Sequence, residues 1–577
     1  MLPQALRRRP LAEVPSQSLL ELPLLLQRLY AVRGIECSTQ LDRRLQRLAD
    51  YRLLTGIKAA VSLLQQALQQ QWKIVIVGDF DADGATSTAL AVLALRRLGA
   101  TMVSYLVLSR FSEGYGLTSP VVQQAKQQGA QLIITVDNGI SSLEGVTLAR
   151  ALGMRVLITD HHLPGPELPP ADAIVNPNLP DCSFPSKALA GVGVAFYLML
   201  ALRASLRISD WFTQSSLVEP NLAELLDLVA LGTVADVVPL DANNRILVYQ
   251  GLQRIRSQQC RPGIQALLSV AQRDPQQLVA TDLGFILGPR LNAAGRLEDM
   301  SLGIDLLLCE QPEQAQVLAQ QLEALNQTRR EVEQAMQQQA LAECQQLMGE
   351  QKILPQGLVL YQPDWHQGVI GIVASRLKSR FHRPVIAFAA AGAGRLKGSG
   401  RSIPGLHLRD LLVQLHQEDP ELMDTFGGHA MAVGLTLAEA QFPRFRECFI
   451  ASVNRVVDDA LLQAVIWSDG ELAVEELTLE TAQLLQTAGP WGQSFPEPLF
   501  DGVFYLKQQR MLAGKHLKMT LLHPQGGSIL EAIAFNVDPN QWPQLQLQSV
   551  RLAYRLTINH FRGNCSLQLL VEQLWPI

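Results

Sequence analysis

Three aspartates spaced two residues apart follow a short run of Val and Ile near the start of the chain. The run 74–77 is typical of a buried strand in a parallel sheet. It leads to Asp79, Asp81 and Asp83, and a long helical pattern follows. The carboxylates therefore lie in a strand-to-helix turn, where open α/β sheets place their ligands. They repel one another unless a cation neutralises them. A polar surface turn explains a lone Asp-x-Asp equally well, so the rest of the chain decides.

Two more hydrophobic runs end in side chains of the same kind. The first, residues 132–136, ends at Asp137. The second, residues 155–159, ends at an aspartate followed by His161 and His162. Helical patterns separate the runs, which indicates a parallel sheet with one functional edge. A further acid, Asp236, lies inside a later apolar run. The candidate site is therefore Asp79, Asp81, Asp83, Asp137, His161, His162 and Asp236.

These residue types indicate a site for divalent cations. Oxygen ligands with one or two imidazoles favour Mg²⁺ or Mn²⁺ over structural zinc. Four carboxylates can hold two cations with one carboxylate bridging, and two cations can promote phosphoryl displacement. An imidazole that is not a ligand can donate to the charge that develops on the phosphate.

Composition limits the class of protein. The net charge of −5 gives no overall sign of nucleic-acid binding, so a polyanion needs a local basic surface. Seven scattered cysteines, never in a C-x-x-C pair, suit reduced thiols and argue against a disulfide framework. The N-terminus is a poor secretion signal, and the apolar run near Val192–Leu202 is far shorter than a membrane span. We expect a cytoplasmic protein without membrane contact.

Several domains are expected for 577 residues. Residues 1 to about 50 have amphipathic helical patterns. Residues 313–348 contain neither Pro nor Gly, which predicts one helix of roughly 50 Å. A strut between domains and a packed core helix both fit it. The apolar residues near heptad spacing in that segment are Leu318, Leu322, Leu325, Val332 and Met336.

The second half of the chain predicts two further folded parts. A strand at Leu358–Tyr361, a helix after it and Gly-rich turns near 392–400 and 427–428 indicate another α/β unit. Beyond about 460, short β-type runs suggest a small barrel of the OB type. These runs are Leu499–Leu506, His516–Leu522, Ile529–Asn536 and Arg551–Asn559.

Eight motifs together resemble one family. GDFDADG at 78–84, VDNG at 136–139 and TDHH at 159–162 resemble the signature motifs of the DHH phosphoesterase superfamily. Five others narrow the resemblance to the RecJ family, bacterial 5′→3′ exonucleases specific for single-stranded DNA, over nearly the whole chain. These are GTVADVVPL at 232–240, RLNAAGR at 290–296, HQGVIGIVASR at 366–376, GSGRS at 398–402 and GGH at 427–429.

The resemblance implies a parallel-sheet α/β DHH domain, a second α/β domain of the DHHA1 type joined to it by a long helix, and a C-terminal OB-type β-barrel. The implied bounds are 1–50 for an N-terminal helical segment, 51–305 for the DHH catalytic domain, 306–350 for the long helix, 351–455 for the DHHA1 domain and 460–577 for the OB-fold domain.

The resemblance also implies two divalent ions, Mn²⁺ or Mg²⁺. One is held by Asp83, His161 and Asp236, and the other by Asp81 with help from Asp79.

Two further residues complete the implied centre. Asp137 bridges the ions, and His162 faces the scissile phosphate as a transition-state group. The implied catalytic residues are therefore Asp79, Asp81, Asp137 and His162.

The resemblance implies DNA contacts outside the metal centre. Arg110 follows another expected strand and meets the 5′ end in similar proteins. Arg290, Asn292 and Arg296 form a cluster suited to the DNA backbone or to stabilising the active-site wall. The second α/β domain contributes backbone contacts and part of a pocket for the terminal phosphate through His366, Ser375, Arg376, Arg401 and His429.

The expected function is stepwise hydrolysis of single-stranded DNA from its 5′ end to mononucleotides, in recombination and repair. Single-strand choice follows if the passage between the two α/β domains is too narrow for a duplex. Family resemblance implies a monomer that works with single-strand-binding protein and a helicase. Two alternatives remain: a hydrolase of the same superfamily acting on short oligonucleotides, cyclic dinucleotides or pyrophosphate, and a non-catalytic single-strand-binding scaffold.

Overall fold

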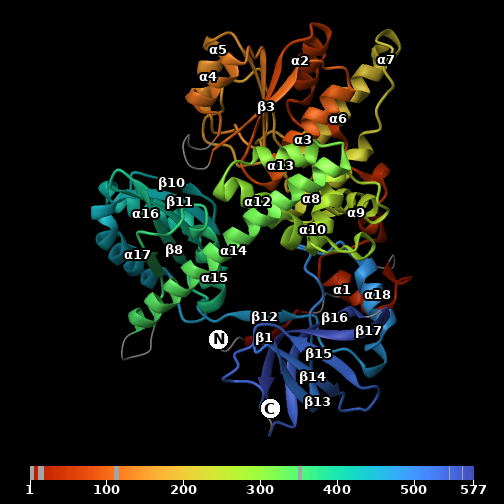
Figure 1. Cartoon of the computed structure of the whole chain (residues 1–577), viewed down its shortest axis with the longest axis vertical. Coiled ribbons are helices and arrows are strands. Elements are labelled where there is room, and N and C mark those ends of the chain that lie inside the picture. Colours follow the sequence, from red (N-terminus) through yellow and green to blue (C-terminus); the bar gives the residue numbers. More distant parts are fainter. Residues whose placement is uncertain (1–4, 11–18, 110–115, 349–353, 545, 562) are drawn as a thin grey trace. The chain divides into compact units, whose positions relative to one another are not determined.

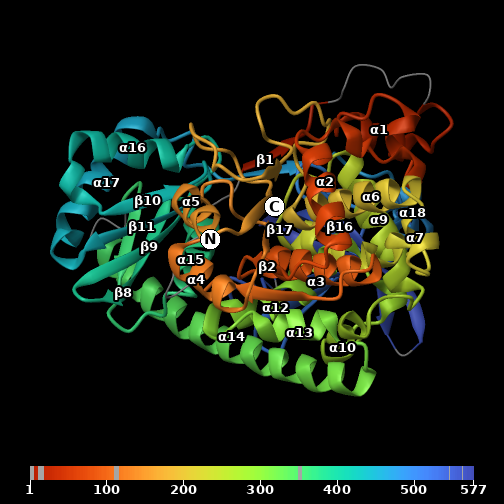
Figure 2. The same ribbon diagram turned by 90° about the horizontal axis from the view of Figure 1, so that it is seen from above.

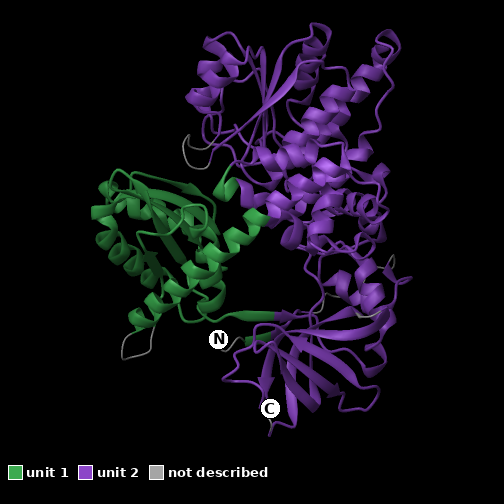
Figure 3. Ribbon diagram, viewed as in Figure 1, with its two compact units in different colours: residues 1–6, 295–298, 324–466 green, residues 7–294, 299–323, 467–577 purple. Residues whose placement is uncertain are grey.

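The computed structural model describes the chain except for residues 1–4, 11–18, 110–115, 349–353, 545 and 562. The chain divides into two compact units (Figure 3). Unit 1 comprises residues 1–6, 295–298 and 324–466, and unit 2 comprises residues 7–294, 299–323 and 467–577.

Unit 2 contains a five-stranded parallel sheet of order β3-β2-β4-β5-β6 (Figure 1), as the sequence predicts. Every residue of β2 and β4 is buried, which fits a sheet covered on both faces. Gly78 pairs with Val136, and Val136 with Thr159, so β2, β4 and β5 end level with one another. The strands are β2 Ile74–Gly78, β3 Val103–Val107, β4 Leu132–Val136, β5 Arg155–Thr159 and β6 Ala173–Val175.

Helices cover this sheet and continue into a helical subregion. α4 and α5 pack on one face in a core that includes Val75, Ile133 and Val156, and α3 and α6 contact the other face (Figure 1). The helices are α2 Ile57–Gln69, α3 Ala82–Arg97, α4 Ser119–Gln127, α5 Leu143–Ala151, α6 Gly191–Ile208, α7 Trp211–Gln214, α8 Leu226–Ala235, α9 Ala242–Arg256, α10 Pro262–Val270, α11 Ala280–Asp282, α12 Gly288–Leu297 and α13 Ser301–Leu308. A π-helix, Leu283–Leu287, joins α11 to α12.

The apolar run near Val192–Leu202 lies within α6. Within the described parts of the chain, α6 is the one helix that is long and apolar enough to cross a membrane by length and composition. Two thirds of it is buried inside the protein, as in the core helix of a globular domain.

The C-terminal part of unit 2 is a closed barrel of order β13-β14-β15-β17-β16, which confirms the predicted OB-type architecture. Its interior contains Phe500, Phe504 and Tyr554. The sequence indicated four of its strands, and the fifth, β17, closes the barrel by pairing with both β15 and β16. The elements are α18 Leu479–Ala488, β13 Phe500–Leu512, β14 His516–Leu522, β15 Leu530–Ala534, β16 Ser549–Phe561 and β17 Asn564–Pro576.

Unit 1 is a second α/β unit, with sheet order β10-β11-β9-β8-β7. One face packs on α16 and α17, and the other on α15 and the end of the long helix α14, Pro312–Met348. The elements are β7 Leu358–Tyr361, α15 Ile370–Phe381, β8 Val385–Gly392, β9 Arg395–Arg401, α16 Leu408–Glu418, β10 Thr425–Gly428, β11 Ala432–Ala438 and α17 Phe442–Val456.

The predicted long helix is α14, Pro312–Met348 (Figure 2). Its 37 residues span about 55 Å. It begins in unit 2 and continues into unit 1, so it joins the two units. The expected apolar face is only partly correct, because Leu318, Leu325 and Val332 are half-buried while polar side chains take fully buried positions.

The helical prediction for residues 1–50 is wrong at their start. Ala5–Arg8 forms a strand, β1, which pairs with β12, Val465–Ser468. Among the described residues of this segment the single α-helix is α1, Leu24–Ala31. Backbone pairing with a distant strand overrides local helix propensity here.

Candidate metal centre and phosphate pocket

The loop after β2 is fixed by its own carboxylates. Asp81 caps α3, because its Oδ1 accepts the N–H groups of Asp83 and Gly84 at 3.0 Å each. The N–H of Ala82 donates to Oδ1 of Asn292 on α12, at 2.8 Å. The start of α3 is therefore held from both sides.

Asp83 is buried against the beginning of α6. Its Oδ2 accepts the N–H of Gly191 at 2.6 Å and its Oδ1 that of Val192 at 2.9 Å. Both N–H groups lie at the N-terminus of α6 and have no acceptor within the helix, and negative charge is favoured at such a position. A Cβ on Gly191 would lie 2.6 Å from the Cβ of Asp137, so only glycine fits this approach.

The side chains from the other segments meet beside Asp83. Nε2 of His161 lies 3.1 Å from Oδ1 of Asp137 and 3.6 Å from Oδ2 of Asp236, the residue that follows α8. Ligand atoms of Asp83, His161 and Asp236 lie within 4.8 Å of one another, as do those of Asp137, His161 and His162. Four segments distant in sequence thus converge on one edge of the sheet.

The electrostatics of this cluster suit a bound cation. Burial, and then repulsion from Asp81, raises the pKa of Asp83 to about 7. Burial and the surrounding carboxylates also raise the pKa values of Asp137 and Asp236 well above the usual range. Oδ1 of Asp137 is buried and, apart from its approach to Nε2 of His161 at 3.1 Å, has no hydrogen-bond partner among the described residues. Divalent cations remove this repulsion, so the donor set fits the ions that the sequence predicts.

His162 is held by a carboxylate that the sequence analysis left without a role. Its Nδ1 lies 2.7 Å from Oδ1 of Asp160, which is itself fully buried. Burial alone lowers the pKa of His162, but the bond to Asp160 and the charges of Asp160, Asp79 and Asp81 raise it to about 9. The bond to Asp160 therefore fixes the ring of His162 beside the carboxylate cluster and favours its protonated form.

Two expected ligands lie outside the two clusters of converging ligand atoms. Oδ1 of Asp79 accepts the N–H of Phe80 at 2.7 Å, and Oδ1 of Asp81 is used for capping. Their coordination of a second ion remains a prediction.

The cluster of Arg290, Asn292 and Arg296 has structural partners. Arg290 is buried, and its guanidinium bonds Glu323 and the carbonyl of Ile286. Oδ1 of Asn292 accepts the N–H of Ala82 and so supports the loop between β2 and α3. For Arg290 and Asn292, these contacts favour a role in stabilising the wall of the active site over a direct contact with DNA.

In unit 1, Arg296 and His366 both contact Gly368. Nη1 of Arg296 donates to the carbonyl of Gly368 at 3.0 Å, and Nδ1 of His366 accepts its N–H at 3.1 Å. His429 is exposed in the turn after β10. Arg110 lies outside the described residues.

Three of the predicted phosphate contacts share a pocket of about 290 Å³ in unit 1. Ser375 and Arg376 come from α15, and Arg401 from the end of β9. A Cβ on Gly371 would lie 3.1 Å from Nη2 of Arg401, so α15 and β9 approach closely here. Two guanidinium groups, those of Arg376 and Arg401, and the hydroxyl of Ser375 therefore line the pocket where an anion is expected.

The groups that orient the ligands were not predicted from the sequence. Asp160 belongs to the TDHH motif, and its position directly before the two histidines could have indicated that it orients them. The N–H groups of Gly191 and Val192 carry no side-chain signature, because they act through the backbone.

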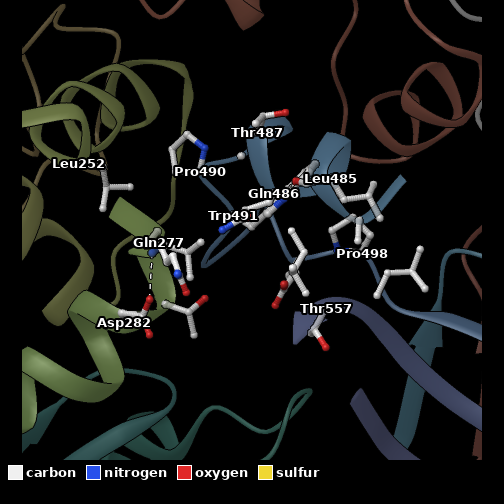
Figure 4. Close-up of a pocket in the computed structure, with 18 of the residues that line it drawn as sticks. Leu252, Gln277, Asp282, Leu485, Gln486, Thr487, Pro490, Trp491, Pro498 and Thr557 are labelled. Atoms are coloured by element: carbon white, nitrogen blue, oxygen red, sulfur yellow. Dashed lines mark hydrogen bonds between the residues drawn. The ribbon is translucent and has the colours of Figure 1, made fainter. Parts of the chain in front are cut away.

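A further cavity of about 390 Å³ lies in unit 2 (Figure 4). It is lined by residues between α9 and α11 and by the barrel side of the unit, including Leu252, Asp282, Leu485, Trp491 and Thr557. None of the predicted site residues lines it.

Three family models match the chain: the DHH family N-terminal domain over residues 73–233, the DHHA1 domain over 354–455 and the RecJ OB domain over 468–573. The chain is 62% identical to the single-stranded-DNA-specific exonuclease RecJ of Dickeya dadantii and 59% identical to that of Escherichia coli, over 99% of both chains in each case.

A solved structure is similar over the whole chain. The crystal structure of RecJ from Thermus thermophilus in complex with Mn²⁺ matches with a TM-score of 0.81 and 30% identity, covering 100% of this chain and 80% of that one. The Mg²⁺ complex of the same protein matches with a TM-score of 0.76 and 28% identity, covering 100% of this chain and 79% of that one.

Proposed function

This chain belongs to the RecJ family of single-stranded-DNA-specific exonucleases, and we propose that it releases mononucleotides from single-stranded DNA in the 5′→3′ direction by metal-assisted phosphodiester hydrolysis. The observation that carries this proposal is the convergence of Asp83, Asp137, His161 and Asp236 at one sheet edge.

The side chains divide into holding and donating roles. Asp83, His161 and Asp236 would hold one divalent ion, and Asp81, with help from Asp79, would hold the second. Asp137 would serve both ions. Bound Mn²⁺ or Mg²⁺ supplies Lewis acidity toward water and the phosphate oxygens.

His162, oriented by Asp160, would donate a proton or a hydrogen bond to the phosphate as charge develops. The pocket of Ser375, Arg376 and Arg401 takes a DNA phosphate through guanidinium and hydroxyl donors. In this proposal it receives the terminal 5′-phosphate, which sets the direction of digestion.

Cellular context is part of the same proposal. By family resemblance the protein acts as a cytoplasmic monomer in recombination and repair, with single-strand-binding protein and a helicase as partners. The closed barrel and α14 favour a polymer over a dinucleotide as substrate.

Digestion of end-labelled strands tests the proposal. With Mn²⁺, a 5′-labelled single strand should release labelled mononucleotide at once, while a 3′-labelled strand shortens gradually. Chelation of the metal should stop both reactions, and a blunt duplex should persist. Early release from the 3′ label would refute the direction, and a preference for dinucleotides would indicate the small-substrate alternative. DNA binding without metal-dependent release would indicate the scaffold.

A further inference from the structure

The buried face of α14 is interrupted by charge. Within unit 1 its buried positions recur at spacings of three and four residues, as expected for one helix face. Met336, Ala340 and Cys344 pack into the apolar core with β7 and α15. Just before them the same face buries Asn326, Arg329 and Glu333. Polar residues therefore take three consecutive positions where this helix otherwise places apolar or small ones.

These three residues form a chain of contacts that leads to the surface. Nη2 of Arg329 donates to Oδ1 of Asn326 at 2.6 Å, and its Nη1 donates to Oε2 of Glu333. The other oxygen of Glu333 accepts Nε of Arg376 at 2.8 Å. The side chains of Arg329 and Glu333 are each 9% exposed, whereas that of Arg376 is 60% exposed.

Stability alone does not explain this arrangement. Desolvation of two buried charges offsets their attraction, and apolar side chains of similar volume in such places are often neutral or stabilising. The rest of the same helix face shows that apolar side chains pack here. The buried charges of Arg329 and Glu333 are accounted for if they serve a function of Arg376, the exposed residue at the end of these contacts.

The exposed end is the phosphate pocket. Arg376 lines it together with Gly371, Ser375 and Arg401. A guanidinium bound through Nε keeps its Nη groups for bidentate contact with a phosphate. A flexible arginine loses rotamer freedom when it binds, and a carboxylate that fixes it in advance reduces that loss.

We propose that Glu333 is a positioning residue, which Arg329 holds in place and which fixes Arg376 for contact with a DNA phosphate. This inference rests on the proposed function, because the phosphate belongs to the bound strand. It assigns a role in substrate binding to the long helix, through side chains that do not themselves touch DNA.

The double variant Arg329→Leu/Glu333→Leu tests this, because it removes both buried charges together. Binding of a 5′-phosphorylated single strand, measured by fluorescence anisotropy in a metal chelator, should weaken about tenfold, the equivalent of one charge-assisted hydrogen bond. KM with Mn²⁺ should rise by a similar factor while kcat stays unchanged. The melting temperature should stay the same or rise. The matched control Arg455→Leu/Glu418→Leu removes an exposed ion pair of unit 1 and should leave both binding and KM unchanged.

A further comparison separates positioning from general damage. Because Glu333 acts through Arg376, the triple variant Arg329→Leu/Glu333→Leu/Arg376→Ala should bind the strand as weakly as the single variant Arg376→Ala, and no more weakly. Three outcomes would each overturn the inference. They are unchanged DNA binding in the double variant, weaker binding accompanied by a lower melting temperature, and weaker binding by the triple variant than by Arg376→Ala alone. If any of these outcomes is found while the wild-type protein still digests single strands, the inference fails but the proposed function stands. If wild-type protein does not digest them, the proposed function itself fails.

Discussion

Oδ1 of Asp160 lies 2.7 Å from Nδ1 of His162 and also accepts the backbone N–H groups of His161 and His162. Its Oδ2 accepts the N–H of Ile140 at 2.9 Å. One buried carboxylate thus fixes both the loop that carries the two imidazoles and the ring orientation of His162. Such supporting groups commonly matter almost as much as the ligands they orient.

Asp160→Asn should therefore lower turnover of single-stranded DNA by about 10- to 100-fold at saturating Mn²⁺, because the amide cannot accept all of these donors. Steady-state digestion of a labelled strand measures this. Asp172→Asn is the control, since Asp172 accepts a backbone N–H in the same domain away from the imidazoles. Equal losses in both variants would mean that general stability, not orientation of His162, causes the effect.

Asp137→Ala should abolish hydrolysis without unfolding the protein. In a chelator its melting temperature should equal or exceed that of the wild type, since one of several repelling buried carboxylates is gone. Ions that bind only the folded state stabilise it, by about 2.7 kcal/mol at a hundredfold excess over Kd. Added Mn²⁺ should raise the melting temperature of the wild type more than that of the variant. Near-normal turnover by Asp137→Ala would disprove the two-ion assignment.

Gly191→Ala should disable the centre by displacing a ligand. The new Cβ would lie 2.7 Å from Oδ1 of Asp137, so the start of α6 or the carboxylate must move. We expect a loss of stability of about 1–3 kcal/mol and a large fall in turnover. Gly165→Ala, whose nearest neighbour would be 3.8 Å away, should be harmless in both thermal melting and digestion. Wild-type activity in Gly191→Ala would contradict the close packing of α6 against Asp137.

A buried carboxylate outside the metal centre gives a prediction of pH dependence. Burial raises the pKa of Asp227 above its ordinary value of 3.8, although the N–H groups of Arg261 and Leu228 oppose this. The folded protein therefore binds this proton more tightly than the unfolded chain does. The stabilising contribution of Asp227 is complete below its unfolded pKa and decreases as pH rises through its folded pKa.

Asp227→Asn removes that titration. Its Nδ2 cannot accept the second N–H, so the variant should be less stable than the wild type in acid. The deficit in melting temperature should shrink from about pH 4 to about pH 7, as the wild type loses the contribution of its proton. Calorimetric melting across that range tests the sign. A deficit that grows toward neutral pH would contradict the raised pKa.

The edge of the parallel sheet was predictable because its signals are local. Each of β2, β4 and β5 is a short buried run followed at once by an acid, and parallel strands bring such ends together. The converging positions of Asp137 and His161 follow from that rule and from strand register.

Other features depend on tertiary contacts that no local pattern encodes. The sequence left a DNA contact and a role in the active-site wall both open for Arg290, and the partner of its guanidinium, Glu323, comes more than thirty residues later. Asn326 and Glu333 look like the polar side of an amphipathic helix, yet both are buried. The role of Asp160 required knowing where the backbone of Ile140 lies.

The pairing of β1 with β12 has a consequence for synthesis. The second strand, Val465–Ser468, lies more than 450 residues after the first. At about 5–20 residues per second, the ribosome needs roughly 25–90 s to make the intervening chain. Until then the backbone of Ala5–Arg8 lacks its partner strand, and Arg8 lacks Asp501. Of the strands that the structure describes, the first to be translated is therefore among the last to be paired, and until then it is an exposed edge that chaperones or proteases can bind.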